Sequence, residues 1–486
     1  MNLTGYGAYL PYWRLERTTI GEALGAPAGA GSRSVASFDE DSTSMGVEAA
    51  RVALRSSTGD APSEVWFATT SPAYADKTNA VAVHAALGLA PEGGAYDVVG
   101  SVRSGLAAIR AASDASAAGR SALAVCADIR TGLSGSADER GGGDGAVALR
   151  FSADEAPIVT ELAWTSVTKE FLDRWRVPGE SASKVWEERF GETAYLPLAQ
   201  QAVSDALGRA GLLASDIDHF VVAGLQERAC SRVAGLLKID KKAVRDDFRL
   251  RIGSPGAAQP GLLLAGALDQ AGPDEVICLV TLADGADCVL LRTTDALAGA
   301  RPAVSVAAMV DGDSASVSYQ RFLNWRGMVR TEPPRRPDPD RPAAPPSLRN
   351  AGWKFAFEAS TCTECGTRHL PPMRTCMTCH SIDKMEPERL ADVQGKITTY
   401  TVDRLAFSAA PPVIAAIVDF DGGGRYACEL TDVDPETVAI GQRVEMTFRR
   451  LYTIDGVHDY FWKARPASTT APSGTDSSSI DSSGEA

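Results

Sequence analysis

The chain of 486 residues has no apolar run long enough to span a membrane, and its first residues lack the charged-then-apolar layout of a signal peptide. It also has no excess of positive charge, because 48 Lys and Arg stand against 62 Asp and Glu, a net charge of −14. We therefore expect a cytoplasmic protein with no membrane and no nucleic-acid partner. The basic residues are scattered, so a local phosphate-binding patch stays open.

Histidine is scarce, with five in the whole chain, and none stands in a pattern typical of a catalytic base. His84 lies in an Ala-rich helical stretch, and His219 precedes a strand-like run. His369 and His380 flank a cysteine cluster, where we expect surface positions. His458 lies near the C-terminus, from where it can reach another domain.

The cysteine cluster is the strongest motif of the chain. Cys362 and Cys365 form one CxxC pair, and ten residues later Cys376 and Cys379 form a second. Two such pairs can converge on one tetrahedral metal ion, and zinc with four thiolates is the usual occupant. Four protein ligands leave no position for water, so the pattern predicts structural zinc in a zinc ribbon; a dithiol redox pair is the alternative.

Residues 1–330 alternate short apolar runs with Ala-rich helical stretches. The runs have the length and composition of buried strands, and buried strands with crossover helices indicate an α/β layered fold. A Gly-containing turn leads into an apolar strand in both 142–151 and 282–293, which indicates a duplicated core of about 150 residues per half. The predicted strands are 64–70, 122–128, 219–225 and 276–282, and the clearest helical stretches are 44–57 and 196–212.

The remaining chain divides by composition. Residues 332–348 hold seven prolines, which exclude a helix or a central strand and indicate an extended linker or strap. Four β-rich runs separated by Gly and Asp turns then indicate a small barrel. The predicted units are 1–330, a Pro-rich linker at 331–350, the zinc ribbon at 351–394, the barrel at 395–466, and a disordered Ser-rich tail at 467–486.

The C-terminal part, roughly 350–466, contains the two CxxC pairs and the segments Leu370-PPMRTC, Gly395-KITTYTV, Gly441-QRVEMTF and Tyr460-FWKARP. In these segments it resembles the zinc-ribbon and OB-fold proteins of the DUF35 family. Members of that family associate with thiolase-like enzymes and are thought to bind or channel the CoA portion of acyl-CoA. The resemblance therefore implies an OB-fold barrel, a CoA thioester ligand and a possible partner thiolase.

Six segments of residues 1–330 carry a second resemblance. They are Gly5-YGAYLP, Phe38-DEDSTSMGVEAAR, Ser71-PAYADKTNAVAVHAALGL, Gly143-DGAVAL, Ile252-GSPGAAQPGLLLAGAL and Tyr319-QRFLNWRG. In these segments the chain resembles the thiolase superfamily, most closely the prokaryotic 3-hydroxy-3-methylglutaryl-CoA synthases. The resemblance implies a five-layered αβαβα architecture, an acyl-CoA substrate, and a homodimer with active sites at the subunit interface.

The chain departs from that family at its catalytic positions. The family uses a cysteine nucleophile at the start of a buried helix, a glutamate and a histidine. By resemblance, Val102 stands at the nucleophile position, Thr70 at the glutamate, and Ala223 or Gly224 at the histidine. Because valine cannot form an acyl-enzyme, the covalent route of the family is excluded at this position.

Four residues are the candidates for catalysis. By resemblance, Tyr74 keeps a tyrosine of the family near the active site, and Tyr195 matches a family region near the substrate pocket. A phenol can transfer a proton; core packing is the alternative. Ser101 lies one residue from Val102, but a serine nucleophile needs a base, and capping a helix N-terminus is the alternative.

Asp128, the fourth candidate, and Arg130 follow a strand end, where α/β folds place functional groups; mutual pairing is the alternative. Arg103 near a helix start suits a carboxylate or phosphate, or an ordinary ion pair. Ser254 matches a Gly-Asn loop at the family's pocket and keeps a hydroxyl there. We name Thr70, Arg103, Arg130 and Ser254 as substrate-binding candidates.

Three functions remain open from the sequence. The first is an acyl-CoA-dependent enzyme that makes or breaks a C–C bond without an acyl-enzyme, such as an aldolase or retro-aldolase acting on a β-hydroxyacyl-CoA. The second is a non-catalytic acyl-CoA-binding scaffold for a partner thiolase. The third is an acyltransferase with a relocated nucleophile such as Ser101 or Cys230.

Overall fold

A computed structural model describes residues 1–467 of the chain except 28, 58 and 336. Its larger part contains a nine-stranded sheet whose strands lie in the order β11-β12-β13-β8-β1-β7-β6-β4-β5. The single pair Leu3 and Val159 joins the two halves. The strands are β1 (Leu3–Tyr9), β4 (Glu64–Thr69), β5 (Gly94–Val99), β6 (Ala122–Ile129), β7 (Asp144–Phe151), β8 (Val159–Thr168), β11 (His219–Gly224), β12 (Val276–Leu282) and β13 (Gly285–Thr293).

The two halves repeat one strand order. In the first half β4 and β6 run parallel, and β7 and β1 follow antiparallel. In the second half β11 and β12 run parallel, and β13 and β8 follow antiparallel. The place of β5 is taken in the second half by a single parallel bridge between Phe220 and Val244. The predicted duplication is therefore present, and β4, β6, β11 and β12 coincide with the four predicted strands.

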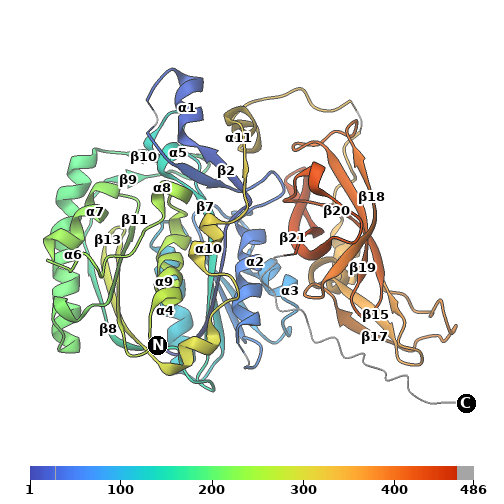
Figure 1. Cartoon of the computed structure of the whole chain (residues 1–486), viewed down its shortest axis with the longest axis horizontal. Coiled ribbons are helices and arrows are strands. Elements are labelled where there is room, and N and C mark those ends of the chain that lie inside the picture. The colour runs from blue at the N-terminus through green and yellow to red at the C-terminus, as the bar shows by residue number, and fades with distance from the viewer. Residues whose placement is uncertain (28, 58, 336, 468–486) are drawn as a thin grey trace, which may run out of the picture.

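Helices complete five layers (Figure 1). α4 (Ser104–Ala117) and α9 (Gln259–Gln270) lie between the two halves of the sheet, and most of α9 is buried. A helix that is apolar all round fits such a central layer. α2 (Ser42–Arg55) covers the outer face of the first half, and α6 (Glu188–Ala210) with α7 (Glu227–Leu236) covers that of the second.

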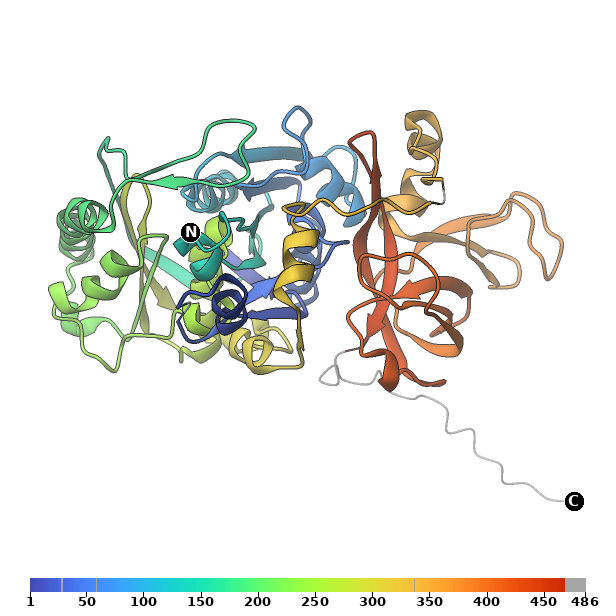
Figure 2. The ribbon, with the colours of Figure 1, turned by 90° about the horizontal axis from the view of Figure 1, so that it is seen from above.

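The C-terminal part is a closed five-stranded barrel in the order β18-β19-β20-β22-β21, preceded by a three-stranded sheet. Figure 2 shows the barrel beside the layered part, with the segment after α11 running across to it. The elements are β15 (Glu358–Cys362), β16 (Arg368–His369), β17 (Met385–Arg389), β18 (Gly395–Asp403), β19 (Val413–Phe420), β20 (Arg425–Leu430), β21 (Arg443–Ile454) and β22 (Val457–Pro466).

The shorter elements complete the chain, and no helix in the described residues is long and apolar enough to cross a membrane. They are β2 (Trp13–Glu16), α1 (Arg17–Leu24), β3 (Ser32–Val35), α3 (Ala80–Ala86), α5 (Ala137–Gly141), β9 (Arg174–Trp175), β10 (Lys184–Val185), α8 (Arg249–Ile252), α10 (Val306–Asp311), β14 (Ala315–Ser316), α11 (Tyr319–Trp325) and α12 (Ala344–Arg349).

One expectation for the Pro-rich segment is wrong. Ala344–Arg349 forms the short helix α12, although Pro345 and Pro346 lie in it. Both prolines stand in the first turn, where a helical N–H has no partner within the helix and its loss costs little. The rest of the segment is irregular, as expected, and the predicted disordered tail lies from residue 468 onward outside the described residues.

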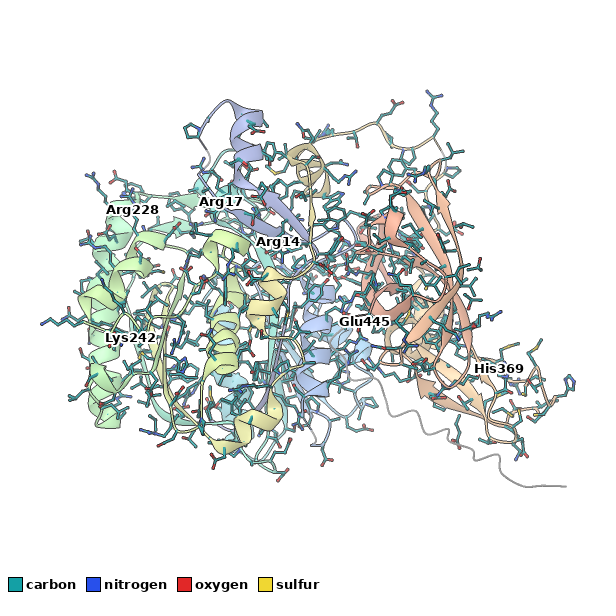
Figure 3. The ribbon with its side chains drawn as sticks, in the orientation of Figure 1. Arg14, Arg17, Arg228, Lys242, His369 and Glu445 are labelled. Atoms are coloured by element: carbon teal, nitrogen blue, oxygen red, sulfur yellow. The ribbon has the colours of Figure 1, made fainter. Side chains whose placement is uncertain are left out.

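Buried charges join the barrel to α2 and the loop before it. Glu48 accepts hydrogen bonds from the backbone N–H of Phe448 at 3.1 Å and from Arg51 at 2.8 Å, and Arg465 lies 3.0 Å away. Burial alone would raise the pKa of Glu48, but the two arginines and the N–H lower it to about 2. Glu445, which Figure 3 labels between the two parts, also pairs with Arg465. The two parts therefore share a buried, charged interface.

Candidate functional site

The three positions that the resemblance singled out lie at two strand ends and a helix start, and we take them as the centre of the candidate site. Thr70 follows β4, Val102 lies just before α4, and Gly224 ends β11. At Gly105 an added Cβ would lie 1.9 Å from the carbonyl oxygen of Ala257, so the first turn of α4 packs directly on the loop before α9. This contact requires glycine at position 105.

Asp128 organises one side of this centre. Its fully buried carboxylate accepts hydrogen bonds from the hydroxyl of Thr70 at 2.8 Å, from the hydroxyl of Ser71 at 2.9 Å and from the N–H of Ala257 at 3.0 Å. Arg130 donates to the Thr70 hydroxyl at 3.0 Å. The structure thus joins the predicted residues Asp128 and Arg130 through Thr70. The hydrogen bonds to the carboxylate oxygens of Asp128 hold the loop of Thr70 in place.

Tyr195 and Asp173 form a buried pair on the other side. The Tyr195 hydroxyl lies 3.4 Å from a carboxylate oxygen of Asp173 and accepts the N–H of Asp284 at 3.3 Å. Burial raises the pKa of both Tyr195 and Asp173. Arg103 donates to the carbonyl of Asp284 at 2.9 Å and pairs with Asp287 at 3.0 Å. Arg103 therefore ties the start of α4 to the loop that holds Tyr195.

Gln259 is a member of this centre that the sequence did not reveal. Its Oε1 accepts the backbone N–H of Gly224 at 3.1 Å and the hydroxyl of Ser254 at 2.9 Å. Its side chain is 1% exposed, and its Nε2 has no hydrogen-bond partner among the described residues. Asp173 was missed as well. A lone glutamine in an apolar helix and a lone aspartate in a loop carry no spacing signal.

The two relocated nucleophiles are poorly placed. The Cys230 thiol is buried against the carbonyl of Gly224, and burial raises its pKa to about 11 although Arg249 lies 3.6 Å away. The Ser101 side chain is exposed, and its oxygen accepts the N–H of Arg103 at 3.3 Å, a contact at the helix start. Neither side chain has a base beside it among the described residues.

Tyr74 lies elsewhere, at the contact with the barrel. Its hydroxyl oxygen accepts the backbone N–H of His458 at 2.8 Å, and the two rings lie 4.7 Å apart. His458 Nε2 lies 3.2 Å from the carbonyl of Ala73. The expectation that His458 reaches another domain is met, and the structure places the two candidate tyrosines in different surroundings.

A cavity of about 520 Å³ opens beside Tyr74, between the layered part, the Pro-rich segment and β22. Its walls combine hydroxyl groups, cations and small apolar side chains. The lining residues are Thr43, Tyr74, Lys77, Asn79, Ala82, Arg341, Pro342, Ala343, Ala344, Pro345, Ser347, Lys354, Phe355, Val457, His458 and Tyr460.

The four predicted cysteines come together in the three-stranded sheet. Their sulfur atoms all lie within 4.8 Å of one another, close to the spacing of about 3.8 Å in a zinc–tetrathiolate tetrahedron. The backbone N–H of Cys379 is the main group that lowers the pKa of Cys376 to about 5. A thiolate is the form that binds metal, so Cys362, Cys365, Cys376 and Cys379 fit a zinc ion.

The expected surface position of His369 is wrong. Its side chain is 7% exposed, and its imidazole contributes to the lowered pKa of Cys376. Figure 3 labels it in this module, at the far side of the barrel from the layered part. The sequence spacing alone did not indicate this contact between His369 and Cys376. His380 is exposed, as expected.

Comparisons with known proteins find relatives of both parts of the chain. A family model described as the C-terminal OB-fold domain of ChsH2 matches residues 388–449. The hydroxymethylglutaryl-CoA synthase of Pyrococcus furiosus is 29% identical over 294 residues, 59% of this chain and 84% of that protein. The synthase of Methanothermobacter thermautotrophicus is 29% identical over 346 residues, 68% of this chain and 99% of that protein.

A solved structure shows the same fold. That of MvaS in complex with 3-hydroxy-3-methylglutaryl coenzyme A has a TM-score of 0.56 at 19% identity, and the match covers 70% of this chain and 94% of that one. The predicted resemblance to hydroxymethylglutaryl-CoA synthases is therefore confirmed. The fold is the duplicated thiolase fold followed by a cysteine-rich ribbon and an OB-fold barrel, as the sequence predicted.

Proposed function

We propose that this chain is an acyl-CoA-dependent C–C lyase of the aldolase type, which acts on a β-hydroxyacyl-CoA without an acyl-enzyme. One observation carries the proposal: the buried Tyr195–Asp173 pair is linked through Asp284 and Arg103 to the start of α4. The resemblance puts Val102 at the nucleophile position there. Retro-aldol cleavage needs a proton acceptor and a stabilised enolate, but no nucleophile. The relatives named hydroxymethylglutaryl-CoA synthase support a CoA thioester as the substrate.

The proposed step balances with the groups present. The β-hydroxyl of the substrate gives its proton to Tyr195 as Tyr195 passes its own to Asp173. The bond between the α and β carbons breaks, the hydroxyl carbon becomes the carbonyl of a released aldehyde or ketone, and the electron pair forms the thioester enolate. The proton on Asp173 then returns to the α carbon and leaves a shortened acyl-CoA. The N–H of Asp284 stabilises negative charge on the Tyr195 oxygen.

The same proposal assigns the other predicted site residues. Asp128 and Arg130 hold the Thr70 loop, and Arg103 holds the loop of Asp284. Ser101 accepts a backbone N–H at the start of α4 and has no chemical role in this proposal. Tyr74 lines the cavity next to the barrel, and we assign that cavity to part of the CoA moiety. Its volume of about 520 Å³ is in the range of small-molecule sites.

Charge supports that assignment of the cavity. Lys77 and Arg341 contribute cations suited to phosphate, and Pro342 and Phe355 contribute apolar surface suited to a pantetheine arm. Arg341 forms a long ion pair, at 3.8 Å, with the exposed carboxylate of Asp455. A fused barrel fixes the ratio of the two modules at one to one and keeps its wall of the cavity in place.

We further propose a homodimer through β5. This strand ends the sheet order, so one of its edges lacks a strand partner among the described residues. Tyr96 and Val99 on it are 45% and 51% exposed. An exposed apolar edge strand is a template for pairing with a second copy. The metal of the ribbon is zinc in this proposal, in a structural role.

A scaffold for a partner thiolase is the second candidate function. It is favoured by exposed apolar side chains in the segment between β8 and α6, where Leu172, Val177 and Trp186 are 52%, 50% and 63% exposed. Such patches mark interaction surfaces. The acyltransferase alternative has less support, because burial raises the pKa of the Cys230 thiol to about 11.

Product analysis separates these functions. The purified full chain is incubated with 3-hydroxyacyl-CoAs of different chain length and branching, and shortened acyl-CoAs and carbonyl products are identified by mass spectrometry. The lyase proposal predicts both products in equal amounts. Binding of the acyl-CoAs without any product supports the scaffold and contradicts the lyase.

A further inference from the structure

The side-chain amide of Gln259 is held in one orientation. The partner of its Oε1 at 3.1 Å is the backbone N–H of Gly224, which can only donate. The amide oxygen of Gln259 must therefore face Gly224, and its NH₂ group takes the other position of the side-chain amide. The Ser254 hydroxyl, at 2.9 Å from the same oxygen, is compatible with this orientation. The assignment of oxygen and nitrogen thus follows from the backbone.

The NH₂ group of Gln259 is a buried donor that has no acceptor among the described residues. The side chain is 1% exposed, and Nε2 has no hydrogen-bond partner among the described residues. Burial of an unpaired donor is unfavourable, and native proteins keep few such groups. A bound acceptor would satisfy it.

The position of this donor points to the acceptor. Gly224 ends β11 and pairs with Leu282 at the end of β12, one strand spacing away. Asp284 follows two residues later, and its N–H bonds the Tyr195 hydroxyl. Gln259 in α9 therefore contacts the end of β11, and Tyr195 in α6 contacts the turn after β12, so both side chains lie against the carboxyl ends of neighbouring strands.

We infer that Gln259 Nε2 donates a hydrogen bond to the thioester carbonyl oxygen of a bound acyl-CoA, and to the enolate oxygen that forms from it. The inference rests on the proposed function for the identity of the ligand. A neutral amide suits this role because it stabilises the developing negative charge without giving up its proton. The ligand must carry a carbonyl oxygen, which a thioether analogue of CoA lacks.

Binding of two matched ligands tests the inference without need of turnover. Acetyl-CoA and S-ethyl-CoA differ at the carbonyl oxygen, and their dissociation constants are measured by calorimetry on the full chain. Wild-type protein is expected to prefer acetyl-CoA. Gln259→Met is expected to weaken acetyl-CoA about tenfold, the effect of one good hydrogen bond, and to leave S-ethyl-CoA unchanged.

Two further variants keep the test decisive. Gln270→Met removes a glutamine from the end of the same helix, whose amide donates to Gly266 at 3.1 Å, and should change neither ligand. Gln259→Leu also removes the donor, and it serves if the Met variant does not fold. It should weaken acetyl-CoA more than S-ethyl-CoA.

The possible results are distinguishable from failure of the lyase proposal. Selective loss of acetyl-CoA binding supports the role of Gln259 even when no 3-hydroxyacyl-CoA is cleaved. Equal weakening of both ligands by Gln259→Met, or a wild-type protein that does not distinguish them, overturns the inference. A lowered carbonyl stretching frequency of bound ¹³C-acetyl-CoA in wild type, lost in the variant, is the expected spectroscopic signature.

Discussion

The hydroxyl of Tyr195 and the carboxylate of Asp173 lie 3.4 Å apart, and the exposed fractions of the two side chains are 4% and 7%. Burial raises the pKa of both groups, so Tyr195 keeps its proton near neutral pH and can pass it to the neighbouring carboxylate. The N–H of Asp284 bonds the Tyr195 hydroxyl, and the carbonyl of Asp284 accepts from Arg103, so the pair is linked to the start of α4. This pair is the basis of the chemistry proposed for the chain.

Tyr195→Phe should remove the proton relay while it keeps the aromatic ring against Phe171. We expect kcat for cleavage to fall by about 10²- to 10⁴-fold, the usual effect of general acid–base catalysis, with a smaller change in KM. The matched control is Tyr6→Phe, because Tyr6 forms a similar buried pair with Asp269 at 2.8 Å, away from the site. Equal loss in both variants would show that only folding was affected.

Tyr74→Phe separates the two tyrosine candidates. Because Tyr74 lies in the cavity beside His458, its loss should act on the binding of the CoA moiety and raise KM rather than lower kcat. Steady-state kinetics of both variants give the comparison. A large fall in kcat for Tyr74→Phe with full activity in Tyr195→Phe would move the chemistry to the cavity.

The rate should depend on the charge of Asp173, because the relay needs its carboxylate to accept a proton. Burial raises its pKa, so kcat should fall on the acid side at a pH above the value of about 3.9 for an ordinary aspartate. The pH–rate profile of the wild-type chain measures this. A rate that stays constant down to pH 4 would exclude Asp173 as the proton acceptor.

Glu48→Gln should destabilise the joined domains at pH 7. The pKa of Glu48 is lowered from 4.5 to about 2, a shift that corresponds to roughly 3 kcal/mol of unfolding free energy. A lowered pKa gives stability that is present above pH 4.5 and lost as the pH falls towards 2. The difference between wild type and variant should therefore shrink over that range in urea unfolding.

A surface pair provides the control for this prediction. Glu180→Gln removes the partner of Lys184 in an exposed pair at 3.5 Å, and we expect a change below about 1 kcal/mol. A Glu48→Gln variant that is as stable as Glu180→Gln at pH 7 would contradict the account of the buried interface.

Zinc content tests the ribbon. The wild-type chain should contain about one zinc ion by elemental analysis, and Cys376→Ser should lose most of it and unfold at lower temperature. Cys428→Ser changes a half-buried cysteine of the barrel outside the cluster and should keep the metal. Iron in place of zinc, or full metal content in Cys376→Ser, would contradict the assignment.

The sequence predicted the features that local patterns encode. The spacing of Cys362 to Cys379 indicated the metal site, and short apolar runs located the strands. The length of an apolar run and the residues that flank it are enough to predict a strand, because the secondary structure of such a segment follows from its own periodicity. The short helix at Pro345 was missed because a proline is tolerated only in the first turn, and the sequence did not show where a turn begins.

Contacts between distant segments were beyond this reasoning. Tyr74 and Tyr195 were equivalent in the sequence, and only the structure separates them, since their partners His458 and Asp173 come from other parts of the chain. Gln259 was missed for the same reason, because its partner Gly224 lies 35 residues away. Buried polar pairs of this kind are set by tertiary packing.

Mass spectrometry of the intact protein during turnover tests the central claim most directly. The wild-type chain is mixed with a 3-hydroxyacyl-CoA that it cleaves, quenched in acid within the first turnovers, and weighed while the small-molecule products are counted. The account predicts that shortened acyl-CoA and carbonyl product accumulate while the protein mass stays unchanged. A protein adduct with the mass of the acyl group, formed as fast as product, would contradict it.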